Sequence, residues 1–259
     1  MAGRFARDPG VKAHYPRRGV YLLPNLFTTA SLFAAFYAIV ASVHGHFRVA
    51  AIAIFIAMIL DGLDGRVARM TGTQSAFGAE YDSLADVIAF GVAPALLVLL
   101  WGLQDYGKFG WLGAFVYTAC GALRLARFNS QVHSASKRYF QGLPIPTAAA
   151  VLTSLVWVAV GERHPWLTRV AEVLALVLVY LLALLMVSNI RYRSFKDFDL
   201  HGRVPFALAI GFVLILALIA IHPPLVLFGA ALLFTLSGPL LTLWQMRQHR
   251  LLRRRHGGR

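Results

Sequence analysis

The sequence predicts an all-α polytopic membrane protein with about eight transmembrane helices and a bundle architecture. Of its 259 residues, 58% are hydrophobic and only 14% are charged, and the mean hydropathy is +0.65. A soluble domain of this length carries more charge and less apolar surface. Several apolar runs approach the roughly 20 residues that cross a bilayer as a helix. Because these runs are continuous rather than alternating, the sequence argues against a strand-built membrane barrel.

Eight candidate spans follow one another with brief connections. They cover residues 25–43, 49–63, 80–101, 109–126, 145–160, 170–188, 204–221 and 224–244. We expect the first span to stay uncleaved, because it is long for a signal-peptide core and no small-residue cleavage site ends it. Gly142, Pro144 and Pro146 precede or open the short span 145–160, and we expect them to shape the turn into it.

Four segments divide the chain. We expect a basic N-terminal arm (1–23), a catalytic transmembrane domain of six helices (24–203), two additional helices (204–245) and a basic tail (246–259). The Arg-rich tail is typical of a segment that lies on anionic lipid headgroups. The net charge of +14 therefore indicates membrane contacts, and nucleic-acid binding is the weaker interpretation.

Five of the 11 acidic residues lie within one short stretch between two apolar runs. They are Asp61, Asp64, Glu80, Asp82 and Asp86. Asp61 and Asp64 are three apart, and Asp82 and Asp86 are four apart, so each pair shares a helix face. A tight turn between the two helices would bring the four aspartates together, while Glu80 is out of phase with them and is expected in a loop or interface.

Four carboxylates at close range require a counter-charge. Arg66 or Arg69 supplies part of it, but a divalent metal matches an all-oxygen ligand set better, as Mg²⁺, Mn²⁺ or Ca²⁺. Two such ions roughly 3.5–4 Å apart form the clamp used for in-line displacement at phosphorus. Gly65 and Gly78 lack a Cβ, so a diphosphate can approach the helices closely. The alternative is that the aspartates are helix caps or salt-bridge partners, but their pairing and the flanking glycines favour the metal site.

The spacing of this stretch resembles the signature D-x2-D-G-x2-A-R-x8-G-x3-D-x3-D of the CDP-alcohol phosphotransferase family. The matching positions are Asp61, Asp64, Gly65, Ala68, Arg69, Gly78, Asp82 and Asp86. Further segments resemble the phosphatidylserine synthase branch of that family, namely "PNLFTTASLF", "GALRLARFN", "YFQGLPIPTAAA" and "LMVSNIRYRSFK". The resemblance covers most of the chain from residue 24 to 196, and no family motif is found beyond residue 204.

This resemblance implies transfer of a phosphatidyl group from CDP-diacylglycerol to L-serine, with release of CMP. It implies that two cations, Mg²⁺ or Mn²⁺ with Ca²⁺ as a substitute, are held by the four aspartates, and that Asp86 is also the general base. It implies that Gly65, Ala68, Arg69 and Gly78 line the nucleotide and diphosphate site. It further implies a homodimer in the cell (inner) membrane. The distribution of basic residues predicts that the active site faces the cytoplasm.

Cationic residues for the carboxylate of serine are expected at the cytoplasmic end of the fourth span. Arg124, Arg127 and Asn129 lie there, and Arg forms bidentate pairs with carboxylates. The alternative is that the two arginines are ordinary cytoplasmic anchors of the helix.

Two further groups of residues are candidates for substrate contacts. Asn25 and Thr28 follow Pro24 and could contact the nucleotide, or they could simply begin the first helix. Arg191 and Lys196 follow the sixth span and could bind a lipid phosphate, or they could be anchors that extend to the interface.

Two rival functions remain open. The first is the same chemistry with another acceptor, such as glycerol 3-phosphate or inositol phosphate, because the signature alone does not specify the acceptor. The second is a cation transporter that uses the aspartates as an ion path. Transporters place such groups near the bilayer midplane and often contain repeats, neither of which this sequence predicts.

The distribution of basic residues predicts the topology. With both termini in the cytoplasm, 21 of the 25 Lys and Arg residues lie on the cytoplasmic side, as positive-inside chains require. The exceptions are Arg48, Lys108, Arg163 and Arg169. Reporter fusions or cysteine labelling at Lys108 and at the C-terminus should therefore report opposite sides of the membrane. Finding both on one side would contradict the eight-span topology.

Overall fold

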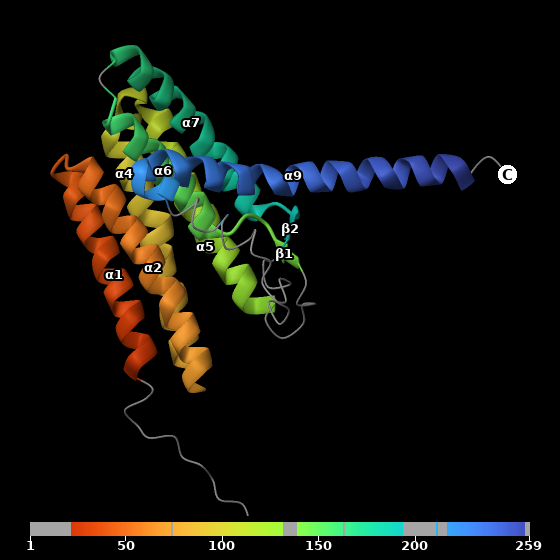
Figure 1. Cartoon of the computed structure of the whole chain (residues 1–259), viewed down its shortest axis with the longest axis horizontal. Coiled ribbons are helices and arrows are strands. Elements are labelled where there is room, and N and C mark those ends of the chain that lie inside the picture. Colours follow the sequence, from red (N-terminus) through yellow and green to blue (C-terminus); the bar gives the residue numbers. More distant parts are fainter. Residues whose placement is uncertain are drawn as a thin grey trace, which may run out of the picture.

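The computed structural model describes residues 22–73, 75–131, 139–162, 164–193, 211 and 217–256 (Figure 1). Residues 1–21 of the predicted basic arm, Lys196 and most of the predicted span 204–221 lie outside these residues. The helices are α1 (Leu22–Val43), α2 (Phe47–Thr71), α3 (Ala76–Asp86), the π-helical η1 (Val87–Val92), α4 (Ala93–Trp101), the 3₁₀ turn η2 (Leu103–Tyr106), α5 (Lys108–Gln131), α6 (Ile145–Val160), α7 (Pro165–Val187) and α9 (Pro223–His256).

The predicted all-α membrane class is confirmed, but the count of eight spans is not. Five described helical stretches are long and apolar enough to cross a membrane: 24–43, 76–101, 108–130, 165–187 and 223–242. Helix α6 is shorter, at 16 residues. Helix α2 has 25 residues, but its last eleven, from Asp61 to Thr71, carry two aspartates and two arginines. Figure 1 shows α9 starting beside α6 and extending away from the bundle, in a direction that differs from that of α1 and α2.

Several helices extend beyond their predicted limits. Helix α2 continues past residue 63 to Thr71 and ends where Gly72 adopts a left-handed φ of 63°. Helix α3 begins at Ala76 instead of residue 80, because the Ser75 side chain accepts a hydrogen bond from the Gly78 N–H and caps the helix. Helix α7 begins at Pro165 instead of residue 170, consistent with the preference for proline in the first helical turn.

The C-terminal helix also differs from the prediction. The sequence predicted a span that ends at 244 and a separate basic tail, whereas α9 continues without a break to His256. Lys and Arg are good helix formers, so the change from apolar to basic residues does not by itself end a helix.

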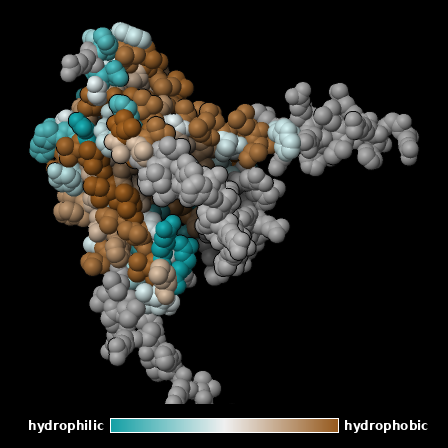
Figure 2. Space-filling view, viewed as in Figure 1, coloured by the Kyte–Doolittle hydropathy of each residue, from teal (hydrophilic) through white to brown (hydrophobic). Residues whose placement is uncertain are grey.

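The helices pack around α6, which contacts α2, α4, α7 and α9. Ten of its 16 residues are buried. Large apolar side chains on the outer helices point outward instead, for example Phe33 on α1 and Trp111 on α5. Figure 2 shows apolar residues covering much of the described surface over α1 and its neighbours. This arrangement suits a bundle whose surroundings are lipid.

Two short strands, which the sequence did not predict, join distant parts of the chain. Strand β1 (Tyr139–Gln141) pairs antiparallel with β2 (Arg191–Arg193), and Phe140 lies opposite Tyr192. They connect the segment before α6 to the segment after α7. Three-residue strands carry too little periodic signal to be read from sequence alone.

The turn after β1 fixes the end of α7. The Gly142 N–H donates to the Ile190 carbonyl at 2.9 Å, and the Leu143 N–H donates to the Leu185 carbonyl at 3.0 Å. Gly142 has a φ of +79°, and a Cβ there would collide with the Met186 carbonyl oxygen. Pro144 then caps α6. The turn predicted at these residues is therefore present.

Replacement of Gly142 should destabilise the bundle. Gly142→Ala adds left-handed strain of about 1–2 kcal/mol and also a steric clash with Met186. Gly45→Ala is the matched control, because Gly45 also has a positive φ, of 74°, but no described atom lies within 4 Å of its added Cβ. Thermal unfolding in detergent should show a larger loss for Gly142→Ala. Equal losses would mean that the contact with α7 contributes nothing.

Candidate functional site

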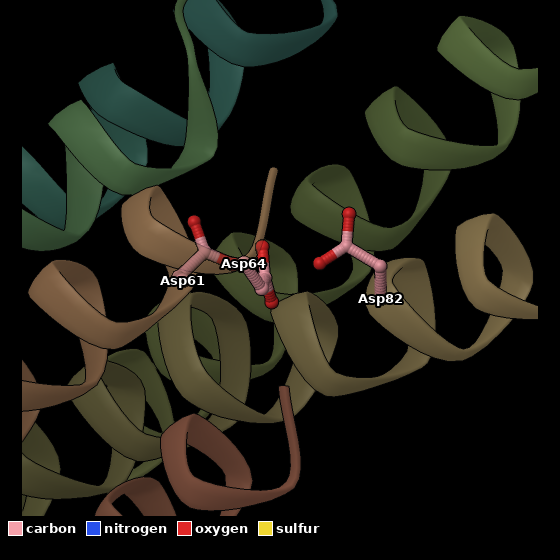
Figure 3. Close-up of side chains that lie close together, drawn as sticks. All are labelled: Asp61, Asp64 and Asp82. Atoms are coloured by element: carbon pink, nitrogen blue, oxygen red, sulfur yellow. The ribbon is translucent and has the colours of Figure 1, made fainter. Parts of the chain in front are cut away.

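Three carboxylates converge where α2 and α3 approach each other (Figure 3). Asp61 and Asp64 project from α2 and Asp82 projects from α3, and one ligand oxygen of each lies within 4.8 Å of the others. The two α2 residues point the same way because α2 remains helical past the predicted end. The turn from Gly72 to Ser75 then returns the chain, so that α3 presents Asp82 to the same place.

Asp86 adjoins this group. It lies one helical turn beyond Asp82, and its carboxyl group is within hydrogen-bonding reach of the Asp61 carboxyl group. Two carboxyl groups so close need a proton or a cation between them. The structure thus brings together all four aspartates that the sequence predicted would converge, whereas Glu80 is exposed and lies outside the cluster.

The cluster fits a divalent cation. The Oδ1 atoms of Asp82 and Asp86 are buried, and neither has a hydrogen-bond partner among the described residues. Buried polar atoms normally have partners, so unsatisfied carboxylate oxygens that face other carboxylates indicate a missing positive charge. The donor set contains only oxygen, which suits Mg²⁺, Mn²⁺ or Ca²⁺.

Helix α1 supports the cluster through Thr28. The Thr28 Oγ1 donates a hydrogen bond of 2.7 Å to Asp64 Oδ2. Both residues are buried, with 3% of Thr28 and 6% of Asp64 exposed. A partner of this kind fixes the orientation of a metal-binding carboxylate. The sequence suggested Thr28 as a nucleotide contact, and the structure places its hydroxyl on a candidate ligand.

The two signature glycines differ in their surroundings. At Gly65, no described atom lies within 4 Å of an added Cβ, so the surface above this residue is open. At Gly78, an added Cβ would lie 3.1 Å from Ser75 Oγ and 3.4 Å from Asn25 Oδ1. The absence of a side chain at Gly78 therefore lets α3 pack against its own cap and against α1. Arg69 is exposed near the end of α2.

Helix α5 lines the other side of the cluster. The charge of Arg124 acts on Asp86, and the Arg124 Nε atom is buried without a hydrogen-bond partner in the described part of the chain. One turn further on, Asn129 Nδ2 donates to Ser83 Oγ at 2.9 Å. The later residue of α5, Asn129, contacts the earlier residue of α3, Ser83, and the earlier residue, Arg124, lies near the later one, Asp86. Helices α5 and α3 are therefore antiparallel here.

Arg127 has a different set of contacts. Its Nη2 donates to Asn189 Oδ1 at 2.8 Å, and its Nη1 lies 3.5 Å from the Val187 carbonyl oxygen. Val187 is the last residue of α7. The guanidinium therefore joins α5 to the end of α7. The backbone of Arg191 lies in β2, but its side chain and the whole of Lys196 lie outside the described residues.

One participant was not predicted from the sequence. Ser83 holds Asn129 and lies between Asp82 and Asp86 in one of the variable spacers of the signature. A serine in a helix usually bonds its own backbone, and Ser83 Oγ also donates to the Ala79 carbonyl at 3.0 Å. The sequence contains no signal for its contact with α5.

Comparisons with known proteins show which sequences this chain resembles. Residues 21–185 match the family model described as CDP-alcohol phosphatidyltransferase. The chain is 45% identical to a CDP-diacylglycerol–serine O-phosphatidyltransferase of Helicobacter pylori over 181 residues, which are 70% of this chain and 76% of that protein. It is 38% identical to a protein of the same name from Mycobacterium bovis over 60% of this chain and 56% of that protein. It is 36% identical to an archaetidylserine synthase of Methanothermobacter thermautotrophicus over 66% of this chain and 69% of that protein.

Loss of the Thr28 hydroxyl should weaken metal binding. Thr28→Val keeps the shape of the side chain but removes the donor to Asp64, and loss of such a partner typically lowers metal affinity about 10- to 100-fold. Thr29→Val is the matched control, because the Thr29 hydroxyl contacts the Tyr81 hydroxyl at 3.0 Å and no carboxylate. Mn²⁺ binding to the purified protein, measured by electron paramagnetic resonance, should distinguish them. Unchanged affinity in Thr28→Val would contradict the assigned role.

Proposed function

The chain belongs to the CDP-alcohol phosphatidyltransferase family, and we propose that it transfers a phosphatidyl group from CDP-diacylglycerol to L-serine, giving phosphatidylserine and CMP. The observation that carries this proposal is the convergence of carboxylates with buried, unsatisfied oxygens beside a half-buried arginine. Serine as the acceptor rests on the names of the bacterial relatives.

Two divalent cations, Mg²⁺ or Mn²⁺ with Ca²⁺ able to substitute, would be held by Asp61, Asp64, Asp82 and Asp86. When bound, they stabilise the charge that develops on the phosphate oxygens and orient the diphosphate. Asp64 is held in place by Thr28. The unsatisfied oxygens of Asp82 and Asp86 are available for coordination from the α3 side.

The reaction is an in-line displacement at the phosphorus that carries the diacylglycerol. The serine hydroxyl oxygen forms a bond to this phosphorus, and the bond from phosphorus to the oxygen of CMP breaks, so CMP leaves with the bonding electrons. Asp86 accepts the proton of the serine hydroxyl as the general base. Its place beside both the cluster and Arg124 suits this role.

Arg124 is the best candidate to bind the serine carboxylate. Its buried Nε lacks a described partner, and a guanidinium can bind a carboxylate through two parallel hydrogen bonds. Asn129 lies on the same helix, near Ser83, and offers an amide oxygen to the serine ammonium group. Arg127 holds the end of α7, so we propose that it shapes this acceptor site through α5.

The nucleotide and diphosphate would lie over the open surface of Gly65. We propose that Ala68, Arg69, Gly78 and Asn25 also contact them from α2, α3 and α1, and the Arg69 side chain is exposed. Arg191 and Lys196 are proposed contacts to the lipid phosphate.

The protein would lie in the cell membrane, which is the inner membrane in Gram-negative bacteria, as a multi-pass protein. The apolar helices support the membrane location. We propose that the cluster faces the cytoplasm, because the surplus of basic residues predicts that side. Figure 1 shows that α1 begins and α2 ends at the same end of the bundle. A homodimer is expected from the family resemblance.

One assay tests the proposed function directly. Purified protein with CDP-diacylglycerol and Mn²⁺ or Mg²⁺ should release CMP when L-serine is added, and a chelator should abolish the release. Glycerol 3-phosphate and inositol phosphate serve as competing acceptors. Release of CMP with either of these but not with serine would contradict serine as the acceptor, but it would not contradict the proposed metal site.

Replacement of Asp86 separates its two roles. Asp86→Asn retains one coordinating oxygen but removes most of the basicity. We expect CDP-diacylglycerol to bind normally while transfer falls about 10²-fold or more, as is typical after loss of a general base. Binding of labelled CDP-diacylglycerol and single-turnover transfer measure the two effects. Equal loss of both would make Asp86 chiefly a metal ligand.

Replacement of the two arginines should have different effects. Arg124→Lys keeps the charge but loses the two-pronged geometry, so the KM for serine should rise more than the KM for CDP-diacylglycerol. Arg127→Lys serves as the matched control and should mainly lower the unfolding temperature, because Arg127 joins α5 to α7. A rise in the serine KM only in Arg127→Lys would reverse these assignments.

A further inference from the structure

The helix that carries Asp82 and Asp86 changes its winding directly after Asp86. Residues Val87–Val92 form a π-helical turn, and the Ala93 N–H donates to the Ile88 carbonyl, five residues back rather than four. The helix nevertheless continues to Trp101. Single π turns inside α-helices are rare and frequently occur at functional sites.

Pro94 explains why the change occurs here. Proline has no N–H, and in an α-helix its ring collides with the carbonyl group four residues earlier, which in this chain belongs to Phe90. The wider π turn relieves this clash. Because Pro94 has no N–H, the Phe90 carbonyl also lacks the donor that another residue at position 94 would supply, inside an apolar bundle where an unsatisfied carbonyl is costly.

Tyr117 of α5 supplies the missing donor. Its side chain is fully buried, and its hydroxyl donates to the Phe90 carbonyl oxygen at 3.0 Å. Tyr117 is followed seven residues later by Arg124, so the two lie on the same stripe of α5. Tyr117 meets Phe90 and Arg124 lies beside Asp86, so one hydrogen bond fixes the register of α5 against both.

We propose that Pro94 and Tyr117 together hold the π turn and thereby set the direction of the Asp86 carboxylate and its distance from Arg124. One residue inserted into an α-helix rotates the preceding part by about 100° relative to the following part, which is enough to turn Asp86 away from Asp61. Tyr117 is a positioning residue, since it touches neither the carboxylates nor the substrate site. The effect on turnover rests on the proposed function, but the effect on metal binding does not.

A second proline within a helix is also accompanied by a buried tyrosine whose hydroxyl donates to the carbonyl four residues before the proline. Pro239 lies inside α9, and the residue four positions earlier is Thr235. The fully buried Tyr192 donates its hydroxyl to the Thr235 carbonyl oxygen at 3.2 Å. This pair joins β2 to α9, neither of which carries an aspartate of the cluster. It therefore provides an internal control with the same chemistry and the same burial.

The test compares Tyr117→Phe with Tyr192→Phe in the full-length protein. Both variants remove a hydroxyl donor from a buried carbonyl and should lower the unfolding temperature in detergent. Only Tyr117→Phe should also weaken Mn²⁺ binding, about 10- to 100-fold as for other supporting residues of metal sites, and slow CMP release. Mn²⁺ alone is the probe, and its binding is measured by electron paramagnetic resonance.

Pro94→Ala carries the test further, and it decides the matter if Tyr117→Phe does not fold. The new N–H can bond Phe90 and let the π turn relax to an α-helix, so stability should be kept while Mn²⁺ affinity and turnover fall. Tyr117→Phe should lower the unfolding temperature less in the Pro94→Ala background than in the parent protein, because the N–H introduced at position 94 then supplies a donor to the Phe90 carbonyl. Pro239→Ala should leave Mn²⁺ affinity unchanged.

Two results would overturn the proposal. The first is unchanged Mn²⁺ affinity in Tyr117→Phe or Pro94→Ala. The second is an equal loss in Tyr192→Phe, which would indicate general loosening of the bundle. Failure of the parent to release CMP with any acceptor would contradict the proposed function instead, and the Mn²⁺ measurements would still decide the role of the π turn.

Discussion

The mutual repulsion of closely packed carboxylates is the constraint on which the rest of the structure depends. Two like charges about 4 Å apart repel by roughly 4 kcal/mol at a typical effective dielectric constant near a protein surface. The chain gathers Asp61, Asp64, Asp82 and Asp86, and within the part that the structure describes no basic residue lies inside this group of ligands. The long α2, the turn from Gly72 to Ser75, and the Thr28 bond all hold this unfavourable arrangement in place. Such a site needs protons or a cation to relieve the repulsion, and an oxygen-only donor set suits a divalent metal, which is why the geometry favours metal-assisted transfer.

Helix α5 determines which chemistry the cluster can perform. It runs antiparallel to α3 and presents Arg124 to Asp86 and Asn129 to Ser83, so a small acceptor would lie between a base and a guanidinium. The position of α5 is fixed at two places along its length. Tyr117 bonds the π turn within the bundle, and Arg127 bonds the end of α7, where Gly142 also docks. The Tyr117 bond to a backbone carbonyl and the Arg127 bond to the Asn189 side chain explain how a helix that contributes no ligand keeps its register.

The sequence predicted the parts of the molecule that depend on periodicity. Apolar runs located most helices, and the spacing of the aspartates placed four carboxylates on two helix faces. Helix limits were less accurate, because Gly72 ends α2 through a left-handed φ and the Ser75 side chain caps the start of α3, and both depend on local geometry. The strands were missed because they pair segments about 50 residues apart. The π turn was missed because Pro94 signals a disturbance but not its form, which depends on the Tyr117 donor. The count of eight spans is not confirmed, because α2 carries charges near its end, α6 is short, and most of the predicted span 204–221 lies outside the described residues.

Equilibrium binding of Mn²⁺ tests the central claim most directly, because it needs neither substrate nor assay of transfer. Titration of the purified protein followed by electron paramagnetic resonance should show two Mn²⁺ ions per chain, close enough for their spins to couple. Asp82→Ala should abolish the coupled signal. No binding, or a single uncoupled ion that persists in Asp82→Ala, would show that the carboxylates do not form a shared metal site.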